Sequence, residues 1–471
     1  MARAPLWTAA EALAATGGRS SADWAAGGVA IDSRSLARGD LFVALAGPNH
    51  DGHDFTAAAF RAGAAAALVS RVPGDLPEGA ALLIVEDTLA ALTALAAAAR
   101  TRTRARVIAV TGSVGKTSSK EALRHVLGAQ GETHAAPGSY NNAFGVPLSL
   151  ARLPQQAEWA VFEIGMNHAG EITPLSRLVA PDVALITTIE AVHLEHFSGI
   201  EAIAEAKAEI FLGLKAEGCA VLNRDNECFG YLAARAADAG VSRTLSFGRH
   251  VAADAHLERL ALHPHCSCVS ASIAGEPVTY KIGAPGEHWV MNSLAVLAGV
   301  KALGADLGQA VLALAGIEPP AGRGRRRRLA LTSGAIELID DSYNASPASM
   351  RAAFAVLALT PVGPRGRRIA VLGDMLELGA TGPALHAALA VDLEGAAIDL
   401  TFTAGRHMER LHEALPAARR GVHGATAADV AAPLLAALRP GDVVLVKGSH
   451  GSRMDLVIEQ LVRAAPAAGT G

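Results

Sequence analysis

The chain has 471 residues, 51% of them hydrophobic, and a formal net charge of −4 at pH 7. At about 150 residues per domain, this length predicts three domains rather than one core. The charge excludes a general nucleic-acid binder, because no excess of basic residues is available to neutralise a phosphate backbone. Apolar runs such as 89–99 are alanine-rich and far shorter than the roughly 18 residues that span a bilayer. The N-terminus lacks a convincing signal-peptide core, so we expect a cytoplasmic protein without a membrane span.

The first domain is expected over residues 1–84, where short strand and helix signals surround IDSRSLARGDLFVAL and DGHDFTAAAFRAGAAAALV. Gly39 and Asp40 predict a turn inside the first of these segments. The pattern indicates a small α/β domain. An alanine-rich helix, predicted over Leu89–Arg100, then leads through the polar segment TRTRAR into a central domain, expected over residues 85–317.

A glycine turn follows the apolar run of RVIAVTGSVGKTS and carries a lysine and two hydroxyl residues. The order predicts a buried parallel strand over Val107–Val110, a phosphate-binding loop and a helix over Lys120–Leu127. Two glycines let backbone N–H groups and a helix N-terminus face one anion, the lysine adds a charge, and the threonine can bind Mg²⁺. The loop is the shortened TGxxGKT form, and a tight turn with an incidental lysine is the alternative. We expect the phosphates of a nucleoside triphosphate to bind at Gly112, Ser113, Val114, Gly115, Lys116, Thr117 and Ser118.

Beyond this loop, AVFEIG, VALITTI and CAVLN alternate with helical patterns, and a helix is expected over Trp289–Leu303. Such alternation predicts a parallel sheet with crossover helices. Four cysteines in so long a chain do not indicate a disulfide framework. The segment LALHPHCSCVSASI could supply zinc ligands, but it favours a single strand, whose neighbouring side chains point to opposite faces.

The segment EPPAG at 318–322, whose prolines and glycine interrupt regular secondary structure, begins a third domain, expected over residues 318–471. Its apolar runs, AIELIDD, RIAVLGDM, LTFTAG and DVVLVKGS, end in small or polar residues. They predict a doubly wound, Rossmann-like domain with ligand groups at the carboxyl ends of its strands. The basic run GRGRRRR is typical of a solvated hinge. Of its residues, we assign only Arg323 to the functional site, where we expect it to contact a γ-phosphate.

Several polar residues of the central domain indicate a functional site only when they are considered together. Glu163 ends the run AVFEIG, where a carboxylate is placed to complete the Mg²⁺ shell begun by Thr117. His193 and His196 follow another strand, in TTIEAVHLEHFSG, and Lys207 lies in the helical pattern AIAEAKAEIFLGL. Taken one at a time, the glutamate is typical of a solvated surface residue, and each histidine is typical of a core or surface residue. The lysine is typical of an exposed residue on an amphipathic helix.

Read together, the TGxxGKT loop, the strand-end glutamate, the HLEHFSG segment and the AKAEIF lysine resemble the ATP-dependent Mur ligase family. The resemblance runs the whole length of the chain. Further matching segments are DSR at 32–34, YNN at 140–142, AGR at 321–323, DDSYNA at 340–345, GDMLELG at 373–379 and VKGS at 446–449.

The resemblance implies a fold of three α/β domains: a small N-terminal domain for a UDP-sugar peptide, a central P-loop ATPase domain, and a Rossmann-like C-terminal domain. It also implies that ATP converts a terminal carboxylate into an acyl phosphate, which an amine then attacks. Charge on the transferring phosphoryl group would be stabilised by Lys116, Arg323, and Mg²⁺ held by Thr117 and Glu163. Lys207 matches the family lysine that CO₂ converts into a carbamate. With His193, this carbamylated lysine would hold a second Mg²⁺.

The resemblance also implies contacts for the nucleotide and the other substrates. Asn292 matches the residue beside the adenine, and Asp341 matches a hinge aspartate that meets the nucleotide. Trp289 and Ser346 depart from the family, which has asparagine at both positions. The expected substrate-binding residues are Ser33 and Arg34 for the uridine nucleotide, with Asn141, Asn142, Asn167, Tyr343, Asn344, Lys447 and Ser449.

Within the family, the segments YNNAFGVPLSL, EIGMNHAGEI and DDSYNASP resemble the branch that adds D-alanyl-D-alanine. The sequence contains no DNPR, the signature of the neighbouring branch that forms the tripeptide. The implied substrates are UDP-N-acetylmuramoyl-tripeptide and D-alanyl-D-alanine, and the implied state is a monomer. Two alternatives are a related amide ligase, such as folylpoly-γ-glutamate synthase, and a noncatalytic nucleotide-dependent scaffold.

Overall fold

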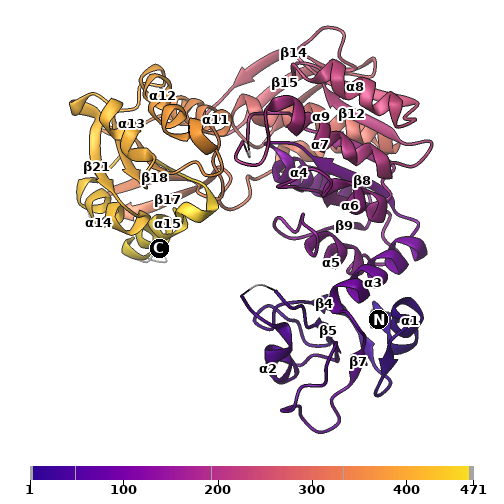
Figure 1. The fold of residues 1–471 in the computed structure, drawn as a ribbon. Coiled ribbons are helices and arrows are strands. Elements are labelled where there is room, and N and C mark those ends of the chain that lie inside the picture. The colour runs from indigo at the N-terminus through magenta and orange to yellow at the C-terminus, as the bar shows by residue number, and fades with distance from the viewer. Residues whose placement is uncertain (1–3, 48, 193, 332–333, 466–471) are drawn as a thin grey trace.

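Three lobes follow one another along the chain in the computed structural model, which describes residues 4–47, 49–192, 194–331 and 334–465. The N-terminal lobe, in indigo, lies at the bottom of Figure 1, the central lobe at the upper right, and the C-terminal lobe, in orange and yellow, at the upper left. Each lobe combines helices with a sheet of its own. This confirms the predicted α/β fold class.

The N-terminal lobe is built on a sheet with the strand order β2-β7-β6-β5-β4, in which β4 to β7 are parallel neighbours and β2 runs antiparallel to β7. The predicted turn is present, because Gly39 adopts a φ of +90° directly before β5. The element bounds are β1 Trp7–Thr8, α1 Ala9–Thr16, β2 Arg19–Ser20, β3 Ala25–Ala26, β4 Gly28–Ala30, β5 Asp40–Val43, α2 Thr56–Arg61, β6 Ala66–Val69, β7 Leu82–Ile84 and α3 Thr88–Arg102.

The central lobe contains the predicted parallel sheet, extended by an antiparallel part. Its order is β16-β15-β14-β13-β12-β11-β8-β10-β9, parallel from β9 to β14 and antiparallel from β14 to β16. The bounds are β8 Arg106–Thr111, α4 Lys116–Gly128, β9 Thr133–Ala135, α5 Gly145–Ala151, β10 Trp159–Glu163, α6 Ile172–Val179, β11 Val183–Ile186, α7 Ile200–Ala208, β12 Cys219–Asn223, α8 Phe229–Asp238, β13 Arg243–Gly248, β14 Ala255–Leu262, β15 Ser267–Ile273, β16 Glu276–Ile282, α9 Glu287–Leu303 and α10 Leu307–Ala313.

Helices cover both faces of this sheet, so β8 is buried on both sides. Ile108 and Val110 pack into a cluster with α4 and α9, whereas Val107 and Ala109 pack into the cluster that contains α6, α7 and α8. This two-sided burial is why the strand reads as a continuous apolar run. The phosphate-binding loop therefore extends from a strand that is buried over residues 107–111.

Two sequence-based expectations in the central lobe are wrong in detail. The helix after the loop begins at Lys116 rather than Lys120, because Gly115 takes a φ of +87° and the chain turns straight into α4. The segment expected as a single strand is instead a hairpin. β14 ends at Leu262, and the turn that follows is closed by a hydrogen bond from His263 N to Cys266 O at 3.0 Å.

The C-terminal lobe is doubly wound, as predicted. Its sheet has the order β17-β18-β22-β19-β20-β21, antiparallel between β17 and β18 and parallel elsewhere, with α11 to α13 on one face and α14 and α15 on the other. The bounds are β17 Arg325–Leu331, β18 Gly334–Asp341, α11 Pro347–Leu359, β19 Arg368–Gly373, α12 Gly382–Gly395, β20 Leu400–Ala404, α13 Met408–Ala414, β21 Arg420–Gly424, α14 Ala427–Ala437, β22 Val443–Lys447 and α15 Asp455–Ala464.

Most of the basic run expected as a solvated hinge belongs to β17, which is the edge strand of the C-terminal sheet. Arg325 to Arg328 pair with Asp340 to Glu337 of β18. Gly322 and Gly324 form the bend before this strand, with φ values of +71° and +94°. No helix in the described part of the chain is long and apolar enough to cross a membrane.

Asp442 supplies a test of the C-terminal lobe, because its fully buried carboxylate accepts hydrogen bonds from Arg367 Nη2 at 2.7 Å, Arg367 N at 2.8 Å and Arg439 N at 2.9 Å. We expect Asp442→Ala to lower the free energy of unfolding by about 3 kcal/mol or more, since removing one partner leaves these donors unpaired. Denaturant unfolding of the full chain measures the change. The control is Asp455→Ala, whose carboxylate forms an exposed pair with Arg453, and equal losses in the two variants would contradict the prediction.

Candidate active site

The phosphate-binding loop connects β8 to α4 and turns at two glycines. Gly112 has a φ of +146° and Gly115 a φ of +87°, both in the region that favours glycine. The Lys116 ammonium lies inside the loop, donating to Gly112 O at 2.7 Å and to Ser113 O at 3.3 Å. Burial lowers the pKa of Lys116, the Glu163 carboxylate opposes this, and the Arg323 charge lowers it further. The loop thus presents an enclosed cation beside the N-terminus of a helix, which is the arrangement that binds phosphate.

A set of polar side chains, of which Thr117 and Glu163 are buried, adjoins this loop. Thr117 Oγ1 donates to Glu163 Oε2 at 2.8 Å, and Asn141 Nδ2 donates to Glu163 Oε1 at 2.7 Å. Ser139 Oγ lies 3.2 Å from Thr117 Oγ1. Glu163, at the carboxyl end of β10, is only 3% exposed. Hydroxyl and carboxylate oxygens are the ligands that Mg²⁺ prefers, so this group can bind a hard divalent cation next to a phosphate.

Lys207 lies near the end of α7 and is 1% exposed. Within the described residues, its Nζ has no hydrogen-bond acceptor. Burial lowers the pKa of Lys207 well below its usual range, and the charge of Lys116 lowers it further. Both effects favour the neutral, nucleophilic amine over the ammonium. His193, which we predict to share a metal with Lys207, lies outside the described residues.

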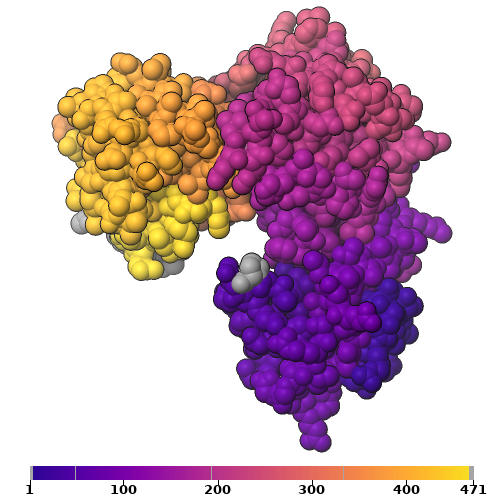
Figure 2. Space-filling model, viewed as in Figure 1, coloured from indigo at the N-terminus to yellow at the C-terminus, as the bar shows by residue number. Residues whose placement is uncertain are grey.

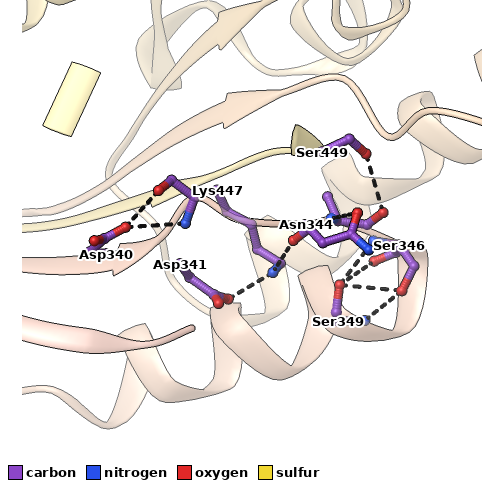
Figure 3. A network of polar contacts seen from close by, with 9 residues as sticks. Asp340, Asp341, Asn344, Ser346, Ser349, Lys447 and Ser449 are labelled. Carbon is purple, nitrogen blue, oxygen red and sulfur yellow. Dashed lines mark hydrogen bonds and ion pairs between the residues drawn. The ribbon is translucent and has the colours of Figure 1, made fainter. Parts of the chain in front are cut away.

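The C-terminal lobe contributes side chains from the carboxyl ends of adjacent strands. Asp341 of β18 and Lys447 of β22 are register partners, and Lys447 Nζ donates to Asp341 Oδ2 at 2.7 Å and to Asn344 O at 2.9 Å (Figure 3). Burial raises the pKa of Asp341, and the Lys447 charge opposes the rise. Ser449 Oγ accepts the N–H of Leu376 at 2.9 Å.

Arg323 connects the two lobes. Its guanidinium lies over the Tyr343 ring, 4.5 Å from the centroid, and its Nη2 donates to Ser139 Oγ at 3.4 Å. The bend that carries it is held by Asp340, whose Oδ2 accepts the Gly322 N–H at 3.2 Å. Arg323 is therefore placed with its charge directed toward the phosphate-binding loop.

A cavity of about 610 Å³ lies between the central and C-terminal lobes. In Figure 2 these two lobes abut, whereas open space separates the yellow part of the C-terminal lobe from the indigo lobe. The predicted site residues that line the cavity are Ser113, Val114, Gly115, Lys116, Thr117, Ser118, Asn141, Glu163, Asn167, Asn292, Arg323, Asp341, Tyr343, Asn344, Lys447 and Ser449.

Three predicted substrate-binding residues are not among those that line this cavity. Ser33 and Arg34 lie in the N-terminal lobe, between β4 and β5, and the exposed Arg34 forms an ion pair with Asp32 at 2.7 Å. Asn142 Oδ1 accepts the Gly145 N–H at 2.9 Å, before α5. The roles of these three residues stay predictions.

Asn292 lies beside the loop, since a Cβ atom on Gly115 would come within 2.8 Å of its Oδ1. Trp289, which departs from the family, is 2% exposed and belongs to the core as well as to the cavity wall. Ser346, the second departure, caps α11 by accepting the Ser349 N–H at 3.3 Å. An asparagine could cap this helix as well.

Several residues of the cavity wall were missed by sequence reasoning. Ser139 contacts both Thr117 and Arg323, and its position directly before the YNN segment was the available signal. His288 also lines the cavity, and burial together with the Lys447 charge lowers its pKa to about 4. The low pKa of His288 could not be predicted from the sequence, because Lys447 lies in the other lobe.

Gly112 tests the phosphate-binding loop. We expect Gly112→Ala to weaken nucleotide binding at least about tenfold, because the new Cβ would collide with the Thr187 hydroxyl, which donates to Val114 O at 2.6 Å. Titration with a fluorescent ATP analogue measures the affinity. Gly128→Ala, at the last residue of α4, is the control, since nothing lies within 4 Å of a Cβ at that position. Unchanged affinity in a folded Gly112→Ala protein would contradict the loop assignment.

Three family models match the chain: "Mur ligase family, catalytic domain" over residues 26–100, "Mur ligase middle domain" over 110–300 and "Mur ligase, glutamate ligase domain" over 325–450. Curated relatives named UDP-N-acetylmuramoyl-tripeptide--D-alanyl-D-alanine ligase include one from Escherichia coli, 38% identical over 94% of both chains, and one from Bacillus subtilis, 35% identical over 93% of both.

Solved structures agree with the sequence comparisons. A MurF structure from Acinetobacter baumannii is 30% identical, with a TM-score of 0.82, and the match covers 97% of this chain and 99% of that one. The MurF ligase of Thermotoga maritima, solved in complex with ADP, is 28% identical, with a TM-score of 0.73 and coverage of 93% and 97%. Across all three lobes, then, the chain belongs to the Mur ligase family.

Proposed function

We propose that the protein joins D-alanyl-D-alanine to UDP-N-acetylmuramoyl-tripeptide at the expense of ATP, in the cytoplasmic synthesis of peptidoglycan precursors. The observation that carries the proposal is the shared cavity, in which a phosphate-binding loop with a carboxylate–hydroxyl cluster faces the Asp341–Lys447 pair of another lobe. The names of the relatives in E. coli and B. subtilis supply the substrates.

In this proposal, the central lobe binds ATP and the substrate carboxylate attacks its γ-phosphate to give an acyl phosphate and ADP. Lys116 and Arg323 stabilise the charge that spreads over the transferring phosphoryl group. The amine of the dipeptide then attacks the acyl carbon and releases phosphate. An α-amine with a pKa near about 8 is partly neutral at pH 7, so this step needs no strong base.

The residues beside the loop fit a magnesium ion. Thr117 and Glu163 would hold it, because their oxygen atoms already lie 2.8 Å apart and are shielded from solvent. Asn141 would orient the carboxylate through its 2.7 Å hydrogen bond. When bound, Mg²⁺ would supply charge neutralisation for the phosphates.

Lys207 fits the proposed carbamate. Its ammonium form is unfavourable in a buried position where the described residues supply no acceptor, and the lowered pKa of Lys207 favours attack of the amine nitrogen on the carbon of CO₂, with loss of one proton. The product is an anion in place of a neutral amine. We propose that this carbamate, with His193, holds a second Mg²⁺.

The three lobes correspond in this proposal to three ligands. The N-terminal domain, residues 1–84, binds the UDP-sugar peptide through Ser33 and Arg34. The central domain, 85–317, binds ATP, and the C-terminal domain, 318–471, binds the dipeptide. We propose that the protein acts as a monomer in the cytoplasm.

Lys207 gives a direct test of the carbamate. Lys207→Arg should lose at least about 100-fold in kcat, as should Lys207→Ala, because arginine keeps a positive charge and forms no carbamate. In ¹³C NMR with labelled bicarbonate, the wild-type protein should show a carbamate signal that Lys207→Arg lacks. Lys215→Arg, at an exposed lysine paired with Asp182, is the control and should keep both signal and activity. Full activity of Lys207→Arg would contradict the assignment.

Phosphate release tests the proposed reaction. It should require both Mg²⁺ and UDP-N-acetylmuramoyl-tripeptide, and it should become sustained only when D-alanyl-D-alanine is added. Single amino acids should substitute poorly, because half a ligand leaves polar groups of the site unpaired. Ligation of diaminopimelate or lysine to the dipeptide-stage precursor at a comparable rate would instead assign the protein to the preceding reaction, which forms the tripeptide. ATP binding without any turnover would favour the scaffold alternative.

A further inference from the structure

Lys120 is a buried cation that the proposed reaction does not use. It lies on α4, one helical turn after Lys116, and has 0% exposure. An ammonium group in the interior is costly unless acceptors surround it, and an apolar side chain of similar length fills the same space at no such cost. Its contacts therefore show what the charge does.

The Lys120 ammonium bonds to a segment outside its own helix. Nζ donates to Ala136 O at 2.7 Å and to Gly138 O at 2.5 Å. Its charge is balanced by Glu121, at 2.8 Å, which also accepts from Arg124 at 2.8 Å. Two of the contacts of Lys120 thus hold backbone carbonyls of one loop, which follows β9.

That loop carries side chains to the oxygen cluster of the site. Ser139 and Asn141 come directly after the two carbonyls that Lys120 holds. Ser139 Oγ contacts Thr117 Oγ1 at 3.2 Å and Arg323 Nη2 at 3.4 Å, and Asn141 Nδ2 donates to Glu163 Oε1 at 2.7 Å. Gly138, with a φ of +64°, permits the bend directly before Ser139. The loop thus reaches both lobes.

We propose that Lys120 is a positioning residue that fixes the segment 136–141 to α4, so that Asn141 orients Glu163 and Ser139 receives Arg323. The proposal rests on the function proposed above. Thr117 and Lys120 are three residues apart on one helix, so the same rigid element sets both the loop hydroxyl and the segment that holds its partners. Without the ammonium, the two carbonyls lose their donor and the segment loses its fixed distance from α4.

The test compares Lys120→Met, which keeps the length of the side chain but not the charge, with Arg124→Met, which removes the other partner of Glu121 from the exposed side of the helix. We expect Lys120→Met to lower kcat about 10- to 100-fold and to raise the Mg²⁺ concentration needed for half-maximal activity, since small misplacements of site residues are costly. The affinity for ADP without Mg²⁺ should change less than about threefold. Arg124→Met should resemble the wild type.

Hydrogen exchange measured by mass spectrometry separates positioning from general destabilisation. Faster exchange in Lys120→Met should be confined to peptides that cover 136–142. Lys120→Gln, which retains an uncharged NH2 donor group, should lie between Lys120→Met and the wild type in kcat, and it replaces Lys120→Met if the latter does not fold. Wild-type kcat and Mg²⁺ response in Lys120→Met, or faster exchange throughout the central lobe, would overturn the proposal. If the wild-type protein shows no ligase turnover, the proposed function fails, while exchange and ADP binding still decide the role of Lys120.

Discussion

Burial of an ammonium group requires acceptors, and the three buried lysines Lys120, Lys207 and Lys447 differ in whether they have them. Lys120 is satisfied by two backbone carbonyls and Glu121, and Lys447 by Asp341 and Asn344 O. Lys207 has no acceptor among the described residues, and its pKa is lowered well below the usual range. Lys120 and Lys447 therefore have partners for a charged ammonium in fixed positions, whereas the surroundings of Lys207 favour its neutral amine. The proposed chemistry depends on this difference, because only a neutral amine reacts with CO₂.

The cavity is shared by two sheets, so the site is complete only while the lobes hold their relative position. The carboxyl ends of β8 and β10 supply the central side, and those of β18 and β22 supply the other. The connection runs through the Gly322 bend, where Asp340 accepts a backbone N–H. Arg323, directly after this bend, has its charge within reach of Lys116 and lowers the pKa of that lysine. A bound polyanion would relieve the repulsion between these two cations.

Much of the fold could be predicted where one physical cause dominates the local sequence. β8 is buried on both faces and its sequence is an unbroken apolar run. α3 extends one residue before and two residues after the expected helix, and α9 begins two residues earlier than expected. The start of α4 was misplaced because the helical state of Lys116 depends on the left-handed Gly115 before it. The hairpin of β14 and β15 was missed because HPHC resembles the alternation of a strand, and only the pairing between the two strands reveals the turn.

The sequence by itself determined the phosphate-binding loop, the strand-end glutamate and the family resemblance, because each depends on residues close together in the chain or on motifs of fixed spacing. Only the tertiary structure decided that Asn141 orients Glu163, that Ser139 joins Thr117 to Arg323, and that Lys120 holds the segment between them. It also decided that, among the buried lysines, Lys207 has no acceptor within the described part of the chain. These properties arise from contacts between distant segments, and burial and charge at a given side chain depend on every element packed around it rather than on its neighbours in sequence.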